Sequence, residues 1–258
     1  MSMNPNDKKM IGVIGGMGPQ AGIDLLQKIL NQTKASSDKE HLSINMISIP
    51  HTITDRTEYL MGKVDINPAE PISEVICTLY NQGATVIGMP CNTAHAKPIF
   101  DEIIERIPKE VKLVHMINEA ADYIKKQFPS VIKVGILSTT GTYISNVYPD
   151  CLSQHGLNGI QVSEKIQENH ISPAIYSKNY GIKAQSNPVT RQAKKDLLLG
   201  IEYLVTERVE AIILGCTEIP LALREDQIKG VPLIDATKVL ARALILEISH
   251  EKLIEENG

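Results

Sequence analysis

The same short pattern occurs twice in this chain: an apolar run that leads to a cysteine, followed at once by small and polar residues. The two cysteines are Cys91 and Cys216. A second pair of similar segments, around Gly12 and Gly135, is separated by almost the same interval. Two landmarks that repeat at nearly one offset predict an internal duplication, in which two similar halves each bring one thiol to a shared cleft.

Short apolar runs alternate with amphipathic stretches along both halves. The pattern predicts strands at residues 11–14, 44–49, 85–89, 113–116, 134–137, 159–162, 211–214 and 233–234. It predicts helices at residues 20–33, 71–82, 96–107, 117–128, 142–154, 189–208, 221–228 and 237–251. Strand–helix alternation is typical of parallel α/β layers, and strands that are apolar throughout predict helices on both faces of a sheet.

We therefore expect an α/β protein with two pseudo-symmetric domains, each a mostly parallel sheet flanked by helices, and an active site in the cleft between them. The predicted domains are residues 1–117 and 118–234. The sequence leaves open whether the last helix, within 235–258, packs back on the first domain.

Composition excludes several classes of function. The chain has 258 residues, 43% of them hydrophobic, and a net charge of −4, which favours a large core and argues against a nucleic-acid partner. No apolar run is long enough for a membrane span, and no signal-peptide core is visible, so we expect a cytoplasmic protein. Four cysteines without a Cys-x-x-Cys pair predict neither disulfides nor a metal site.

A glycine-rich turn, residues 15–21, follows the first predicted strand and contains Gly-x-Gly-x-x-Ala starting at Gly16. A dinucleotide site would need an acidic residue at the end of the second strand, and residues 48–51 have none. Pro19 also removes a backbone donor from the loop. We interpret the turn as a close backbone approach to a small ligand, preferably an anion, or to the other domain.

Cys91 and Cys216 are the candidate catalytic residues. A single cysteine after a strand is usually a packing residue, but a pair at equivalent places, each opening a polar turn, favours catalysis. Free N–H groups at a helix start would lower the pKa of a thiol and could hold a carboxylate. Such donors would come from Asn92, Thr93, Thr217 and Glu218. Two opposed thiols suit the removal of a proton from one face of a carbon and the return of a proton to the other.

The basic residues among the candidates have two interpretations each. Arg56 could bind both oxygens of a carboxylate, but spacing alone favours equally an exposed ion pair with a neighbour such as Asp55. Lys183 stands among uncharged neighbours, so spacing alone favours a solvated side chain. His95, four residues after Cys91, could tune the thiol, although a structural role in the turn is the better interpretation.

Several polar segments follow predicted strands, where parallel sheets bind ligands. They are residues 15–19, 50–56, 91–95, 138–142 and 216–218. Residues 138–142, Ser-Thr-Thr-Gly-Thr, can both cap a helix and hold a small polar group. We expect all five segments to face one crevice.

At these residues the chain resembles the aspartate/glutamate racemases that need no pyridoxal phosphate, most closely the aspartate racemases. The similar segments are residues 14–19, 55–57, 89–95, 138–142, 214–218 and 231–235. The resemblance implies the two-domain fold, a homodimer, an amino-acid substrate, no cofactor, and Cys91 and Cys216 as the two acid/base residues. It implies Asn92, Thr93 and Thr217 around the α-carboxylate, with Arg56 and Lys183 on the side-chain carboxylate.

The complete set of predicted substrate contacts is Met17, Thr52, Arg56, Asn92, Thr93, Thr139, Thr140, Thr142, Lys183, Thr217 and Glu218. Residues 51–54 and 175–183 depart from the aspartate racemases, and both would border the substrate side chain. The hypothesis is therefore racemisation of an acidic amino acid, with aspartate first. Glutamate or broad-specificity racemisation, isomerisation or decarboxylation of a dicarboxylic acid, and a non-catalytic amino-acid-binding protein are the alternatives.

Overall fold

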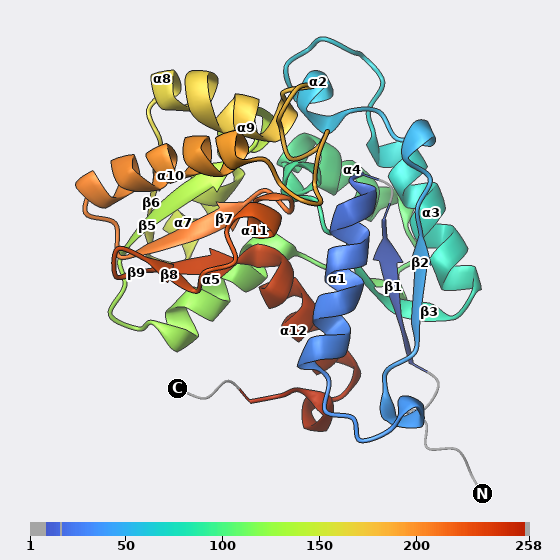
Figure 1. Cartoon of the computed structure of the whole chain (residues 1–258). Helices are drawn as coiled ribbons and strands as arrows, with labels where there is room; N and C mark the ends of the chain where they lie inside the picture. The colour runs from blue at the N-terminus through green and yellow to red at the C-terminus, as the bar shows by residue number, and fades with distance from the viewer. Residues whose placement is uncertain (1–8, 16, 256–258) are drawn as a thin grey trace, which may run out of the picture.

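The computed structural model describes residues 9–15 and 17–255, and two parallel sheets organise them (Figure 1). The first sheet has the strand order β2-β1-β3-β4, and the second has the order β6-β5-β7-β9-β8. Their strands are β1 Met10–Ile14, β2 Ile44–Ile47, β3 Ala84–Gly88, β4 Lys112–Val114, β5 Lys133–Ser138, β6 Asn158–Gln161, β7 Ala211–Gly215, β8 Gln227–Ile228 and β9 Val231–Asp235. This arrangement confirms the predicted α/β fold with two mostly parallel sheets.

The two sheets share one plan. In each, the first strand of the half lies between the second and the third, and every neighbouring pair is parallel except the short edge pair β8 and β9. Cys91 follows β3 and Cys216 follows β7, which occupy the same position in the two sheets. The repeated sequence interval therefore corresponds to a repeated topology.

Helices cover the sheets. They are α1 Pro19–Gln32, α2 Arg56–Leu60, α3 Ala69–Asn81, α4 Lys97–Arg106, α5 Met116–Gln127, α6 Thr140–Ile144, α7 Val147–Gln154, α8 Glu164–Ile166, α9 Ser172–Tyr176, α10 Arg191–Thr206, α11 Ile219–Ala222 and α12 Ala236–Ile248. A five-residue π-helical turn, Gln167–Ile171, joins α8 to α9. The segment from α8 to α9 was not predicted, because its apolar residues are few and its turns are irregular.

Two predicted helices are wrong in detail. The helix expected over 142–154 is two helices, α6 and α7, because Asn146 between them adopts a left-handed backbone conformation with φ 51°. The helix expected over 221–228 is instead the short α11 followed by strand β8, which adds an antiparallel edge to the second sheet.

The last helix joins the halves. α12 packs along α1 and α5, and Figure 1 shows the red α12 beside the blue α1. One hydrophobic cluster contains side chains of β1, α1, β5 and α12, so the two halves share a continuous core. The predicted boundary at residue 117 lies in the first turn of α5 and stays a prediction.

Candidate active site

Loops at the carboxyl ends of the strands from both halves enclose one small cavity. Its lining residues are Met17, Arg56, Thr57, Pro90, Cys91, Asn92, Thr93, Thr139, Tyr176, Lys183, Cys216, Thr217 and Glu218. The cavity gives about 20 Å³ to the centres of water molecules, which is room for roughly one water. A ligand larger than a water molecule therefore enters only if the walls separate.

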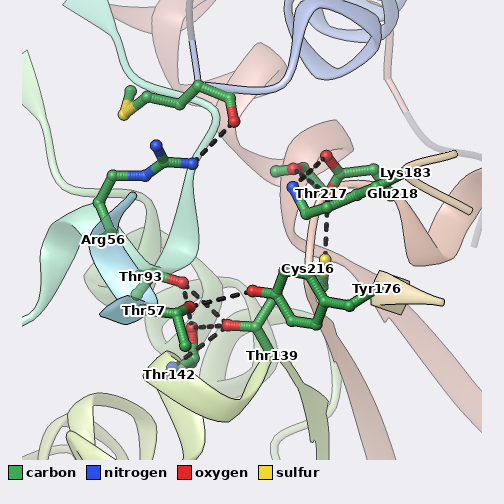
Figure 2. Close-up of polar contacts among 11 residues, drawn as sticks. Arg56, Thr57, Thr93, Thr139, Thr142, Tyr176, Lys183, Cys216, Thr217 and Glu218 are labelled. Carbon is green, nitrogen blue, oxygen red and sulfur yellow. Dashed lines mark hydrogen bonds and ion pairs between the residues drawn. The ribbon is translucent and has the colours of Figure 1, made fainter. Parts of the chain in front are cut away.

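Arg56 lies at the Cys91 side of the cavity and is 8% exposed. Its guanidinium donates to the carbonyls of Met17 at 2.8 Å and Thr54 at 3.2 Å, the first of which is drawn in Figure 2. Burial lowers the pKa of Arg56, but the negative charge available on Cys91 and Asp55 more than offsets this, so the pKa is raised. Arg56 is thus a fixed cation beside the first thiol.

The exposed ion pair considered for Arg56 is wrong. Asp55 instead accepts hydrogen bonds from the N–H groups of Thr57 and Glu58 and caps α2. The Arg56 Nε is buried and has no hydrogen-bond partner among the residues that the structure describes. A buried unpaired donor is costly, and a bound carboxylate would satisfy it.

A carboxylate stands beside the second thiol. Cys216 donates its S–H to Oε2 of Glu218 at 3.0 Å, and the hydroxyl of Thr217 donates to the same oxygen at 3.1 Å. The other oxygen, Oε1, accepts from Nζ of Lys183 at 2.9 Å (Figure 2). Lys183 is therefore paired with Glu218, while its side chain remains 28% exposed.

The charges in this cluster are set by burial and by each other. Burial raises the pKa of Glu218, but Lys183 and the donors from Cys216 and Thr217 hold it below the ordinary value. Burial lowers the pKa of Lys183, but Glu218 and Cys216 raise it above the usual range. Burial first, and then the Glu218 carboxylate, raise the pKa of Cys216 well above that of an ordinary thiol.

The expectation that a helix start lowers the pKa of both thiols is therefore wrong for Cys216. Cys216 lies three positions before the start of α11, and its carbonyl accepts the N–H of Ile219 at 3.0 Å. The nearby carboxylate and full burial outweigh the helix start, so Cys216 stays protonated at neutral pH.

Hydroxyl groups join the halves at the cavity wall. Oγ1 of Thr93 lies 2.9 Å from Oγ1 of both Thr139 and Thr142. Figure 2 marks these contacts with dashed lines. Thr139 also accepts the N–H of Thr142 and caps α6. A second bridge joins Oγ1 of Thr57 to the Tyr176 hydroxyl at 3.0 Å.

Asn92 supplies a donor to the cavity. Its Oδ1 accepts the hydroxyl of Tyr148 at 2.6 Å, whereas its buried Nδ2 has no hydrogen-bond partner in the part of the chain described. His95 donates from Nδ1 to the carbonyl of Cys91 at 2.9 Å, and its Nε2 accepts the N–H of Met116 at 3.3 Å. His95 thus fixes the turn that carries Cys91, which agrees with the structural role favoured for it.

The glycine-rich turn approaches an anion that belongs to the protein itself. A Cβ on Gly18 would lie 2.5 Å from Oε1 of Glu218, so only a glycine leaves room for this carboxylate. The turn therefore makes a close approach to the other half, which was one of the two interpretations, and the small anionic ligand stays a prediction. Gly16 lies outside the described residues.

Three predicted contacts lie away from the cavity wall. Thr52 is exposed and donates to the carbonyl of Ile49, and Thr140 faces Ser172 at 3.3 Å in a neighbouring hollow. Thr142 lies behind Thr93 and supports it.

Thr57 and Tyr176 line the cavity and were missing from the predicted substrate contacts. Thr57 belongs to the 55–57 segment that carries the resemblance, so its position offered a signal. Tyr176 ends α9, in the region whose helices were not predicted, and no spacing marks it.

Two other kinds of site, a metal-binding cluster and a membrane-spanning helix, are absent from residues 9–15 and 17–255. No group of three or more His, Cys, Asp or Glu side chains there is arranged to hold a metal ion. Within the same ranges, no helix combines the length and apolar character needed to cross a membrane.

The fold and site define an α/β protein with two mostly parallel sheets, in which one thiol from each half meets the cations Arg56 and Lys183 and the amide of Asn92 in a single cavity. The sequence profile described as Asp/Glu/hydantoin racemase matches residues 14–244. The chain belongs to this family and is an amino-acid racemase of the Asp/Glu type.

The proteins that this chain is similar to are named for different substrates. The structure of Picrophilus torridus aspartate racemase is similar with 29% identity and a TM-score of 0.78, over 96% of both chains. The broad-specificity amino-acid racemase RacX of Bacillus subtilis is 25% identical over 92% of this chain and 96% of its own. Glutamate racemase of Carboxydothermus hydrogenoformans is 25% identical over 68% of this chain and 61% of its own.

Proposed function

We propose that this chain racemises an acidic amino acid, with aspartate as the first candidate, by a two-thiol mechanism without a cofactor. The observation that carries the proposal is the cavity itself. It joins Cys91 and Cys216, from opposite halves, to the cations Arg56 and Lys183. A thiol on each side of the substrate carbon is what inversion by proton removal and return requires.

The remaining wall residues supply donors for the substrate. The unpaired Nδ2 of Asn92 and the hydroxyls of Thr93 and Thr217 would hold the α-carboxylate as it gains enolate character. The unpaired Nε of Arg56, together with Lys183, would hold the side-chain carboxylate.

The reaction moves one proton to the protein and one proton from it. Cys91, as thiolate, takes the α-proton, and the C–H bond breaks as the S–H bond forms. Cys216, as thiol, gives its proton to the opposite face of the carbon and becomes the thiolate. The roles are exchanged for the other enantiomer, because the product of one direction is the substrate of the other.

Closure of the halves would raise the strength of these interactions. A cavity of about 20 Å³ holds no aspartate, so binding needs the halves or the loops to separate and then close over the substrate. A closed, dry site strengthens the donors around the carboxylate, and this supplies what the two thiols alone cannot.

The test is racemisation without added cofactor. Purified protein is incubated separately with L-aspartate, L-glutamate and a panel of neutral and basic L-amino acids, and the products are separated by chiral chromatography. Formation of D-aspartate above all others supports the proposal. Equal rates across the panel would favour broad specificity, as in RacX. Binding without conversion of any amino acid would favour a non-catalytic binder.

Two further expectations stay predictions. Homodimer formation is checked by light scattering on the purified chain. The cytoplasmic location is checked by fractionation of the source cells.

A further inference from the structure

Glu218 touches the two functional groups that the second half brings to the cavity, Cys216 and Lys183. We propose that Glu218 is a positioning residue that makes the two thiols unequal: it holds Cys216 as the proton donor of the resting enzyme and leaves Cys91 as the proton acceptor. This inference rests on the proposed racemisation, and its first test does not depend on that activity.

The geometry leaves Glu218 one arrangement. Its side chain is buried at 4% exposure, with Oε1 on Lys183 and Oε2 on both Cys216 and Thr217. Gly18 packs against Oε1 from the first half and has no side chain to displace it. A buried carboxylate with this many donors stays ionised, so it accepts the Cys216 proton in a hydrogen bond rather than carrying one itself.

The duplication identifies where the asymmetry arises. Cys216-Thr217-Glu218 in the second half corresponds to Cys91-Asn92-Thr93 in the first. The counterpart of Glu218 is therefore Thr93, which is neutral and bonds to the hydroxyls of Thr139 and Thr142. One position of the repeat thus places a negative charge beside one thiol and none beside the other.

The remaining groups around Cys216 do not reverse this effect. Lys183 lowers the pKa of Cys216, but by less than burial and Glu218 raise it. Tyr148 of α7 and Tyr176 of α9 also face Cys216. Burial raises the pKa of Tyr148 well above its ordinary value and that of Tyr176 to about 12, so both phenols stay neutral.

Unequal thiols should give different kcat and KM values for the two enantiomers of the substrate. Two enantiomers have equal free energy in solution, so kcat/KM must be the same in both directions. The asymmetry can therefore appear only in kcat and KM separately. The enantiomer that starts at Cys91 meets the resting protonation state, whereas the other needs Cys216 as the thiolate beside Glu218.

The first test measures thiol reactivity without a substrate. Each protein is treated with iodoacetamide from pH 6 to pH 10, and alkylation of Cys216 and Cys91 is quantified by peptide mass spectrometry. Cys91 is the internal reference, because it lines the same cavity and shares its access. We expect Glu218→Gln to raise the Cys216-to-Cys91 alkylation ratio at pH 8 by about tenfold, as expected for a pKa about one unit lower.

Two variants make this result specific. Lys183→Met removes the cation that favours the Cys216 thiolate, so it should lower the ratio. Glu225→Gln is the matched control, because it makes the same chemical change at an exposed carboxylate paired with Lys194. Circular dichroism confirms the fold of each variant. An alkylation ratio in folded Glu218→Gln that follows the wild-type pH curve would overturn the proposal.

The second test uses the racemase reaction. We expect wild type to show different kcat values for the two enantiomers at equal kcat/KM, and Glu218→Gln to bring the two kcat values at least threefold closer. Glu218→Asp, which keeps the charge, should restore part of the difference. A shift in alkylation without racemisation of any amino acid would leave this inference standing and remove the proposed function. Racemisation with unchanged kcat values in Glu218→Gln would leave the proposed function standing and remove the inference about Glu218.

Discussion

The two halves of the molecule have the same strand order but opposite charges beside their cysteines. Cys91 lies next to the buried cation Arg56, whereas Cys216 donates to the buried carboxylate of Glu218. The repeated topology brings the thiols together, and the residues that differ between the repeats place a cation beside one thiol and a carboxylate beside the other. A duplicated scaffold can therefore supply a symmetric geometry for a reaction whose two ends must be in different protonation states.

The halves also differ in how they hold the cysteine turn. In the first, the ring of His95 connects the Cys91 carbonyl to the start of α5. The equivalent position in the second half is Pro220, in the first turn of α11. The first turn is thus held by a buried side chain, and the second by a short helix and the Glu218 cluster.

The largest expected effect comes from removing either thiol. Cys91→Ala and Cys216→Ala should each lower racemisation by roughly 10²–10⁴-fold, because each removes one acid/base group. The remaining thiol should still exchange the α-proton of one enantiomer, a different one in each variant, as measured by proton NMR in heavy water. Cys77→Ala on α3 is the control and should keep wild-type rates. Exchange of the same enantiomer in both variants would contradict opposed thiols.

The next largest effect is expected from a change at the cation Arg56. Arg56→Lys keeps the charge but loses the planar fork and its Nε donor, so kcat/KM for an acidic amino acid should fall by roughly 10–100-fold. The measurement is steady-state kinetics on aspartate and on a neutral amino acid of similar size. An equal loss of kcat/KM for both substrates would show that Arg56 does not bind the side-chain carboxylate.

Two glycines where the halves approach each other differ in how much their replacement should lower the free energy of unfolding. A Cβ on Gly141 would lie 2.6 Å from Oγ1 of Thr57 and 2.7 Å from Cγ2 of Thr93, where the halves meet. Gly141→Ala should therefore lower the free energy of unfolding by about 1–3 kcal/mol. A Cβ on Gly18 would lie 2.5 Å from one side-chain oxygen, Oε1 of Glu218, and 3.6 Å from the next nearest atoms, so Gly18→Ala should displace this carboxylate and lower activity with a smaller change in stability. Urea unfolding of both variants checks the order, and the reverse order would contradict this account.

The last prediction concerns the dependence of stability on pH. Burial first, and then the positive charge of His115, lower the pKa of His95 to about 3, below the unfolded value of about 6.5. Between these values the unfolded chain binds the proton and the folded chain does not. The stability from a neutral His95 is therefore full above pH 6.5 and is lost as the pH falls towards 3, by up to about 1.4 kcal/mol per pH unit.

His95→Gln should flatten this dependence and lower stability at pH 7. The check is the midpoint of urea unfolding from pH 4 to pH 8 for both proteins. His115, whose pKa burial lowers to about 4, contributes in the same direction and remains in the variant. A variant with the wild-type slope would show that His95 does not carry the effect.

Much of the fold was predictable because it rests on local patterns. Apolar runs of strand length, helical spacing between them and the repeated interval gave both sheets and placed Cys91 and Cys216 at equivalent strand ends. The split at Asn146 and the π-helical turn at Gln167–Ile171 were missed, because a left-handed residue and an irregular turn leave little trace in hydrophobic spacing.

The electrostatics of the site could not be predicted from spacing. Lys183 and Glu218 are far apart in sequence, and only the fold brings them within 2.9 Å of each other, with the Glu218 carboxylate buried. The same burial reversed the expected effect on the pKa of Cys216. Tyr176 reaches the cavity through helices that the pattern did not show.

The most direct test of the two-thiol account follows label during the first few per cent of the reaction in heavy water. L-aspartate is incubated with wild-type protein, and deuterium at the α-carbon is measured in both recovered enantiomers. Two opposed thiols predict that D-aspartate carries deuterium while the recovered L-aspartate retains hydrogen, because the returning proton comes from a second group equilibrated with solvent. Equal deuterium in both enantiomers at this early stage would mean that one group serves both faces, and it would contradict the account.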